Sequence, residues 1–354
     1  MSTDLFAPFR LGPLELANRI VMAPMTRNRT PDTVPNDLNV EYYAQRAGAG
    51  LIITEGVQPS AVGQGYPGTP GLHTDAQTDG WRRVADAVHA RGGTIIAQIM
   101  HAGRISHPDL IGTTPVSSSA TRPAGQVFTG SGMQDFHTPR ALELDELPGI
   151  VEEYVDAARR AVAAGLDGVE LHAANGYLLH QFLADGINVR TDAYGGSGEA
   201  RARFVLEVAR AVAAEVGPQR VGIRISPGGS FNDVAEVEVE ATYTALVEGL
   251  APLGLLYLHV IADADTDYVE GLRKQFAGPT IINTGIEGPS DLATGQQIVD
   301  EGNGDLFAIG RAFIANPDLV ERLRTGAPLA AGDEGSYYGG DAGGYTDYPT
   351  LTAA

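Results

Sequence analysis

The 354-residue chain contains no cysteine. This excludes disulfides, thiol nucleophiles, iron–sulfur clusters and Cys-ligated zinc. Lysine is almost as scarce, because Lys274 is the single lysine among 24 basic residues. Schiff-base chemistry, as in pyridoxal phosphate enzymes and lysine aldolases, would depend on that one residue. The sequence also lacks an apolar run of the ~18 residues needed to cross a bilayer.

Basic charge is in short supply as well. The 44 acidic residues give a net charge of −20 and a pI near 4.7. Such a chain repels phosphate backbones, so nucleic acid and anionic membrane surfaces are excluded as expected partners. The N-terminal MSTDLFAPFRLG lacks the apolar region of a secretion signal, which predicts a cytoplasmic protein. Hydrophobic residues make up 43% of the chain, enough to fill a large core.

Short aliphatic runs recur eight times, without the strict alternation of a half-exposed strand. This pattern is typical of strands buried on both faces. The runs are Ile20–Pro24, Leu51–Glu55, Thr94–Met100, Gly168–His172, Val221–Ser226, Leu255–Ile261, Thr280–Thr284 and Asp305–Ile309.

Segments with helical spacing of Ala, Leu, Glu and Arg lie between these runs. Eight strands alternating with eight helices predict a closed (β/α)8 barrel, a TIM barrel in the α/β class. A doubly wound open sheet is the alternative, but no GxGxxG follows the first strand. The predicted helices are Leu38–Ala49, Asp75–Ala90, Leu147–Ala164, Ala200–Val216, Glu240–Leu250, Tyr268–Phe276, Asp291–Val299 and Asp318–Leu323.

Two segments decorate the predicted barrel. Residues 101–144, between strand three and helix three, are rich in Pro, Ser, Thr and Gly and predict an excursion over the barrel mouth. Residues 327–354 form a tail rich in Gly and Tyr, expected to pack as irregular structure on the barrel. No linker divides the chain, so we expect one domain over 1–354.

Polar residues gather where the predicted strands end, which is where active sites lie in such barrels. Loops after strands seven and eight often bind phosphate in this fold. Here they carry Gly285, Gly310 and the forked cation of Arg311, although both glycines could be ordinary turn residues. The other polar groups at strand ends include Thr26, Gly56, Gln98, His172, Asn175, Tyr177, Arg224 and Asn283.

The group around His172 is suited to hydrogen-bonding an oxygen. His172 and Asn175 are three residues apart at a strand-to-helix junction, and neither is acidic, while Tyr177 could donate a proton. The alternative is a satisfied buried histidine and a helix-capping asparagine. Arg224 interrupts an apolar strand, which indicates either an anionic cofactor or a structural ion pair.

A metal-dependent barrel hydrolase is the chief chemical alternative. Its ligands would come from His101, His172, His259, Glu55 and Asp263, but no HxH or HExxH spacing supports them. The sequence therefore favours no metal site.

Nine stretches along nearly the whole chain resemble the Old Yellow Enzyme family of flavin-dependent ene-reductases. The most specific are GVELHAANGYLLHQFL (168–183) and NVRTDAYGGS (188–197). Others include NRIVMAPMTRNR (18–29), AQIMHAGRISH (97–107) and FAIGRAFIANPDL (307–319). The resemblance implies FMN bound at the mouth of a (β/α)8 barrel, with NADPH or NADH as the electron donor.

The resemblance also implies roles for individual residues. Ala23, Pro24 and Met25 would lie along the flavin, and Thr26 would hydrogen-bond its C4 carbonyl. Gly56 would allow close approach to the ring, Gln98 would hydrogen-bond the pyrimidine edge, and Arg224 would lie near N1. The ribityl phosphate would be surrounded by Asn283, Gly285, Gly310 and Arg311. His172 and Asn175 are similar to the pair that holds a substrate's activating oxygen, and Tyr177 to the proton donor. Hydride would pass from flavin N5 to an electron-poor alkene with ping-pong kinetics.

Met100 departs from the family, many of whose members carry a bulky aromatic residue there. A flexible thioether would widen the pocket. Phe231 and Tyr338 are expected in the substrate pocket by position. A flavin barrel that acts mainly on nitro esters or nitroaromatics, or that only binds ligands, is the alternative function. The protein is expected to be a monomer or homodimer.

Overall fold

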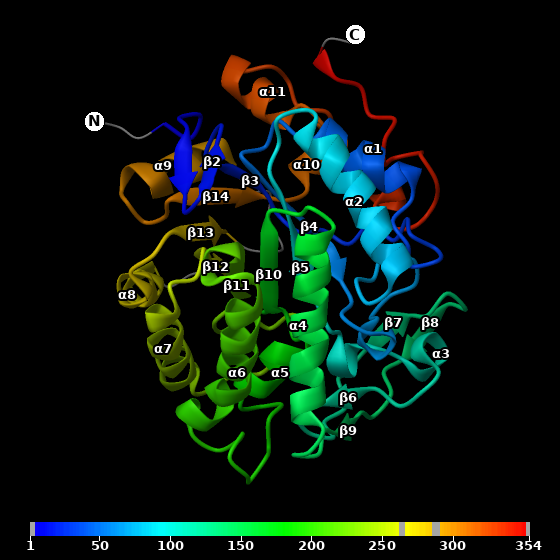
Figure 1. Cartoon of the computed structure of the whole chain (residues 1–354), viewed down its shortest axis with the longest axis vertical. Helices are drawn as coiled ribbons and strands as arrows, with labels where there is room; N and C mark the ends of the chain where they lie inside the picture. Colours follow the sequence, from blue (N-terminus) through cyan, green and yellow to red (C-terminus); the bar gives the residue numbers. More distant parts are fainter. Residues whose placement is uncertain (1–3, 262–265, 285–290, 352–354) are drawn as a thin grey trace.

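Eight parallel strands form a closed barrel in the computed structural model, which describes residues 4–261, 266–284 and 291–351 (Figure 1). The predicted (β/α)8 barrel is confirmed, and the open sheet is wrong. Each barrel strand coincides with a predicted apolar run to within two residues. The strands are β3 (Ile20–Met22), β4 (Leu51–Val57), β5 (Ile95–Ile99), β10 (Gly168–Ala173), β11 (Val221–Ile225), β12 (Tyr257–Ile261), β13 (Thr280–Asn283) and β14 (Leu306–Ile309).

Helices cover the outside of the barrel, and every predicted helix is present. Short helices that the sequence did not predict are α3 (Pro108–Ile111), α5 (Leu178–Leu183) and α10 (Ala312–Ala315). The predicted ones are α1 (Asp37–Gln45), α2 (Asp75–His89), α4 (Leu147–Ala163), α6 (Gly198–Val216), α7 (Val239–Leu250), α8 (Thr266–Phe276), α9 (Leu292–Asp300) and α11 (Leu319–Thr325).

The prediction that the first helix continues to Ala49 is wrong. Helix α1 ends at Gln45, and Arg46 is its C-cap. The buried Arg46 guanidinium donates to the carbonyl oxygens of Phe313 (2.9 Å) and Ile314 (2.8 Å) in α10. This contact across the barrel wall, together with the glycines that follow, stops the helix four residues early.

Local sequence explains the start of α2 and the face that it buries. Thr74 Oγ1 accepts from Gln77 N, and Gln77 Oε1 accepts from Thr74 N, which forms a capping box. Three to four residues separate the buried Trp81, Val84 and Val88, so they form one stripe of the helix against the barrel.

A hairpin that the sequence did not predict covers the N-terminal end of the barrel. Strands β1 (Phe9–Leu11) and β2 (Leu14–Leu16) pair antiparallel and lie beside β14 and α9 in Figure 1. Leu11 and Leu16 are buried in one cluster with Leu51 and other residues of the barrel interior. The opposite, C-terminal end of the strands is therefore the end available for a site.

The 101–144 segment contains more regular structure than its composition suggests. Strands β6 (Val116–Ser117) and β9 (Arg140–Ala141) pair in parallel. Between them, β7 (Gln126–Phe128) and β8 (Met133–Asp135) form an antiparallel hairpin.

Three buried arginines from the N-terminal third of the chain hold the C-terminal tail. Arg27 donates to the carbonyl oxygens of Tyr337 (2.9 Å) and Gly344 (2.8 Å). Arg29 and Arg46 also donate to tail carbonyls, and the Tyr345 ring stacks on Tyr42 at 4.1 Å between centroids. The tail is thus fixed to the wall of the barrel by charge-assisted hydrogen bonds.

Glu55 is a buried carboxyl beside this arginine cluster, and it makes stability depend on pH. Burial raises the pKa of Glu55 from 4.5 to about 7, although hydrogen bonds from the Arg27 backbone and the Tyr43 hydroxyl oppose the shift. Between these two values the folded protein keeps a proton that the unfolded chain loses. The free energy of unfolding should therefore fall as pH rises from 5 to 8, by up to about 3 kcal/mol.

Glu55→Gln removes this titration. The pH dependence of the unfolding free energy, measured by urea denaturation at pH 5 and pH 8, should become shallower by a similar amount. Glu15→Gln, at an exposed position where the carboxylate pairs with Arg10, is the matched control and should keep the wild-type slope. An identical slope in wild type and Glu55→Gln would contradict the assignment.

Candidate active site

A cavity of about 690 Å³ lies at the C-terminal end of the barrel strands. The barrel contributes Gly56, Gln98, His172, Arg224 and Asn283 to its wall. The loops that follow β3, β4, β5, β10, β11 and β14 complete it, together with the β7–β8 hairpin and the tail. Their lining residues are Ala23, Pro24, Met25, Thr26, Arg27, Asn28, Tyr66, Pro67, Met100, Gln126, Val127, Phe128, Met133, Phe136, Asn175, Tyr177, Phe231, Asn232, Gly310, Arg311, Ile314, Tyr337 and Tyr338.

Strand register brings the polar barrel residues to the same height. His172 pairs with Arg224 across β10 and β11, and Gly56 pairs with Gln98 across β4 and β5. The register shifts between Ile53 and Gly56, an irregularity of the kind found beside active sites. A Cβ on Gly56 would lie 2.7 Å from Met100 Sδ, so the glycine provides the space that Met100 occupies.

A tight turn after β10 sets the position of Asn175. Its φ of 58° lies in the left-handed region, which asparagine tolerates better than most residues. Its backbone N–H donates to Ser226 Oγ (3.0 Å), and its carbonyl accepts from Asn232 Nδ2 (2.8 Å). Asn175 is therefore held from two sides by the loop that follows β11.

Buried His180 fixes the next residue of this turn. Gly176 N donates to His180 Nδ1 at 2.9 Å, so that nitrogen accepts and the imidazole proton is on Nε2. Nε2 lies 3.2 Å from Glu236 Oε1, which also accepts from Tyr243 OH at 3.1 Å. Through His180, this network joins the turn after β10 to Glu236, in the loop that follows β11.

Tyr177 lies beside a second tyrosine that the sequence did not single out. Its hydroxyl is 3.0 Å from the Tyr66 hydroxyl, and its ring centroid is 5.0 Å from that of His172. Burial raises the pKa of Tyr177 above its ordinary value of 10, and hydrogen bonds from Tyr66 and Asn232 only partly offset this. The phenol thus keeps its proton at neutral pH.

His172 and Arg224 give the cavity one neutral ring and one buried cation. Burial lowers the pKa of His172 well below 6.5, and the positive charge of Arg224 lowers it further. His172 is therefore neutral at pH 7. Arg224 Nη2 donates to Asn283 Oδ1 at 3.2 Å, and Asn283 Nδ2 donates to the Ala308 carbonyl oxygen at 2.9 Å.

Several cavity residues carry buried polar atoms without a hydrogen-bond partner among the described residues. They are Asn28 Oδ1, His172 Nδ1, Asn175 Oδ1 and Arg224 Nε. Buried polar groups in proteins are usually paired. The two amide oxygens can accept from a ligand, and the guanidinium of Arg224 favours negative charge, so the cavity fits a bound polar group that carries both hydrogen-bond donors and anionic character.

The structure brings together the predicted site residues that it describes. The cavity is lined by every residue that the sequence assigned to the flavin or substrate site, from Ala23 to Tyr338, with one exception. The exception is Gly285, which lies outside the described residues. Arg311 is the N-cap of α10.

The residues of the metal alternative do not converge. No group of three potential ligands forms within the described chain. His259 instead contacts Glu170 at 2.8 Å, and Asp263 lies outside the described residues.

Sequence reasoning missed the residues that loops bring to the cavity. Tyr66 follows β4 in a GQGYPG turn, and an aromatic residue in a Gly-rich loop after a barrel strand is a usable signal. Asn232 and the hairpin residues Phe128 and Met133 gave no such signal, because their positions depend on how long loops fold back over the barrel.

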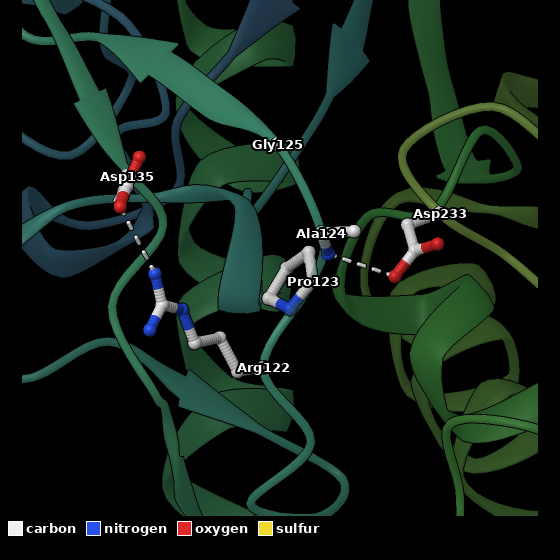
Figure 2. A pocket seen from close by; sticks show the side chains of 6 residues that line it. All are labelled: Arg122, Pro123, Ala124, Gly125, Asp135 and Asp233. Carbon is white, nitrogen blue, oxygen red and sulfur yellow. Dashed lines mark hydrogen bonds and ion pairs between the residues drawn. The ribbon is translucent and has the colours of Figure 1, made fainter.

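A second hollow, with a volume of about 420 Å³, lies where two of these loops meet. Figure 2 shows the six residues that line it. Ala124 N donates to Asp233 Oδ2 at 2.8 Å, and Arg122 contacts Asp135 at 3.6 Å. Beneath them the buried Arg104 donates to the carbonyl oxygen of Asp233 at 2.7 Å. The two contacts to Asp233 attach the loop that carries Phe231 and Asn232 to the 101–144 segment, while the Arg122–Asp135 contact lies within that segment.

The chain matches the model of the "NADH:flavin oxidoreductase / NADH oxidase family" over residues 4–330. It belongs to this family. It is 42% identical to 12-oxophytodienoate reductase 1 of Oryza sativa subsp. japonica, over 98% of this chain and 93% of that protein. It is 40% identical to flavin oxidoreductase hxnT of Emericella nidulans, over 98% and 97%.

Solved structures agree with this assignment. Morphinone reductase in complex with tetrahydroNAD has a TM-score of 0.94 and 48% identity, covering 99% of this chain and 98% of that one. The Old Yellow Enzyme homologue from Zymomonas mobilis has a TM-score of 0.95 and 39% identity, covering 99% and 100%. The resemblance to the Old Yellow Enzyme family is confirmed. The protein is an FMN-dependent NAD(P)H oxidoreductase of this family, whose members reduce activated alkenes.

None of the described helices is long and apolar enough to span a bilayer.

Proposed function

We propose that the enzyme reduces the C=C bond of α,β-unsaturated carbonyl compounds, with FMN and substrate held in the 690 Å³ cavity. The observation that carries this proposal is the grouping of neutral His172, Asn175 and a protonated Tyr177 beside the buried cation Arg224. When bound, FMN supplies hydride that it has taken from NAD(P)H.

The cofactor would be held mainly by the barrel. Gln98 and Arg224 present an amide and a cation at the base of the cavity. The adjoining wall is lined by Ala23, Pro24, Met25, Thr26 and Gly56. Asn283, Gly310 and Arg311 line the side after β13 and β14, where phosphate binds in many barrels. Gly285 is proposed to join them, by sequence alone.

The substrate would be activated from one side and protonated from the other. His172 and Asn175 would donate hydrogen bonds to the carbonyl oxygen, where negative charge grows as the β-carbon accepts hydride. Tyr177 would then give its proton to the α-carbon. Met100, Phe231 and Tyr338 would bound the substrate's apolar body, and residues 101–144 would cover the mouth of a single-domain barrel.

The visible spectrum of the purified protein tests this proposal. We expect a yellow protein that bleaches on anaerobic addition of NADPH or NADH and regains its colour with 2-cyclohexenone. Steady-state kinetics should be ping-pong, because both substrates use one cavity. Reoxidation by a nitrate ester but not by 2-cyclohexenone would replace alkenes by nitro compounds as the substrate class. A colourless protein that cannot be reconstituted with FMN would contradict the proposal.

Met100 should control the size of accepted substrates. It is buried against Tyr177, Val127 and Phe136 at the wall of the cavity. An indole in its place would fill space next to Tyr177. We therefore expect Met100→Trp to lower kcat/KM for a fused-ring enone roughly tenfold more than for 2-cyclohexenone, an effect typical of lost pocket volume.

The matched control is Met100→Leu, which conserves volume and should leave the ratio of the two kcat/KM values close to wild type. A ratio that is the same in Met100→Trp as in the wild-type enzyme would exclude Met100 from the substrate pocket.

We also propose a cytoplasmic location and a monomeric or homodimeric state, in keeping with the acidic, cysteine-free composition. Sedimentation equilibrium measures the latter directly.

A further inference from the structure

Glu170 is a fully buried carboxylate directly beneath the cavity, and it does not line the cavity itself. Its Oε1 accepts from Gln98 Nε2 at 2.7 Å. Its Oε2 accepts from Tyr257 OH at 3.0 Å and contacts His259 Nδ1 at 2.8 Å. Each of these residues is at most 2% exposed. Two strands besides β10, namely β5 and β12, thus supply three partners to one carboxylate in the barrel interior.

The barrel is built to accommodate this group. Glu170 pairs with Gln98 on β5 and with Gly222 on β11. A Cβ on Gly222 would lie 2.2 Å from Tyr257 Cζ, so only glycine leaves room for the tyrosine ring to reach the carboxylate. A buried carboxylate is costly unless it is paired and hydrogen-bonded. The described contacts supply the hydrogen bonds, and the nearby Arg224 supplies the opposite charge.

Glu170 carries a negative charge close to Arg224, because it pairs with Gly222, two residues before Arg224 on β11, and its neighbour on the same face of β10, His172, pairs with Arg224 itself. Burial alone would raise the pKa of Glu170, but His259 and the charge of Arg224 bring it below its ordinary value. Burial lowers the pKa of Arg224, and Glu170 raises it. Burial also lowers the pKa of His259, while Tyr257 keeps its proton because burial raises its pKa. The base of the cavity therefore holds one anion and one cation.

Two cavity-lining groups depend on this carboxylate. The Gln98 amide nitrogen is committed to Glu170, which leaves the Gln98 carbonyl oxygen free to accept from a ligand N–H. Arg224, whose Nε has no partner among the described residues, keeps only part of its positive charge for the cavity because Glu170 opposes it.

We propose that Glu170 is a positioning residue for the cofactor: it orients the Gln98 amide toward the flavin and balances the charge of Arg224, so that it sets the relative affinity for oxidised and reduced FMN. This rests on the proposed placement of the flavin against Gln98 and Arg224. It does not depend on which substrate reoxidises the enzyme.

The test compares Glu170→Gln with Glu170→Asp in the holoenzyme. Glu170→Gln removes the charge, so Arg224 is uncompensated and the reduced, more negative flavin is favoured. We expect the affinity ratio for reduced over oxidised FMN to rise on the order of tenfold, which is about +30 mV in the midpoint potential of a two-electron couple. Glu170→Asp keeps the negative charge, but its shorter side chain moves the carboxylate away from the Gln98 amide. We expect its midpoint potential to stay near wild type, while its Kd for FMN, from fluorescence titration of the apoprotein, rises roughly tenfold.

The matched control is Glu153→Gln, a half-buried carboxyl on α4 outside the cavity, which should change neither quantity. Unchanged potential in Glu170→Gln would overturn the charge role. If Glu170→Gln does not fold, an unchanged Kd in Glu170→Asp overturns the orienting role. Failure of the wild-type enzyme to reduce 2-cyclohexenone would overturn the proposed reaction alone, because neither readout uses an alkene.

Discussion

Replacing Tyr177 with phenylalanine is expected to slow reoxidation of the reduced enzyme by an enone by roughly 10²- to 10⁴-fold, the usual contribution of a positioned general acid. Reduction of the enzyme by NAD(P)H should be nearly unchanged, because that half-reaction needs no proton from the cavity. The structure supports this asymmetry: Tyr177 is buried, its raised pKa keeps the phenol protonated, and it lies beside His172. Anaerobic stopped-flow absorbance follows the two half-reactions separately.

Tyr66 is the control that this experiment needs. Its hydroxyl is 3.0 Å from that of Tyr177, and either group can be the donor of this hydrogen bond. Tyr66→Phe should therefore have a smaller effect than Tyr177→Phe, and the double variant should resemble Tyr177→Phe. Equal slowing of both half-reactions in Tyr177→Phe would remove Tyr177 from the donor role. A double variant much slower than Tyr177→Phe would indicate that Tyr66 replaces it.

The sequence predicted the barrel because its strands are buried on both faces. Runs such as VGIRIS (221–226) and GLIITEG (50–56) contain only one or two polar residues per strand, so each polar residue is conspicuous. Arg224 and Gln98 were singled out for this reason, and the barrel rule for strand ends placed them together. The helix over Asp75–Ala90 was equally clear, because helical spacing is a local pattern.

Contacts between distant segments were not predictable in this way. Arg27 reads as an ordinary basic residue after a strand, yet it donates to the carbonyl oxygen of Gly344, 317 positions away. Glu170 is visible in the sequence as an acidic residue inside an apolar strand. Its partners come from β5 and β12, and strand register alone decides that Gln98 and Tyr257 reach it.

The β7–β8 hairpin illustrates the same limit at the surface. Its Phe128 and Met133 are half exposed, and they line the cavity only because the 101–144 segment is anchored beside the loop after β11. Arg104 makes that anchor by donating to backbone carbonyl oxygens, which every residue type provides. No residue pattern encodes such a contact, so the cover of the cavity required the structure.

Replacing His172 or Asn175 with alanine is expected to weaken the binding of a phenol to the oxidised holoenzyme by roughly 10- to 100-fold each. A phenolate oxygen resembles the enolate oxygen that these side chains would hold, and a hydrogen bond to a charged group contributes about 1.5–3 kcal/mol. His172 Nδ1 has no partner among the described residues, so a proton on it can be donated to the phenolate without breaking another contact. Titration of the long-wavelength absorbance of the phenol–flavin complex measures the Kd.

The pH dependence of these variants separates hydrogen bonding from charge. Because burial and Arg224 keep the pKa of His172 well below 6.5, His172 is neutral from pH 6.5 to pH 9. The loss in His172→Ala should therefore be constant over that range. Phe231→Ala, which removes a cavity-lining ring without a hydrogen-bonding atom, is the matched control and should change the Kd much less. A loss that disappears above pH 7 would mean that His172 acts as a cation, and unchanged affinity in both alanine variants would exclude the pair as the oxygen-binding site.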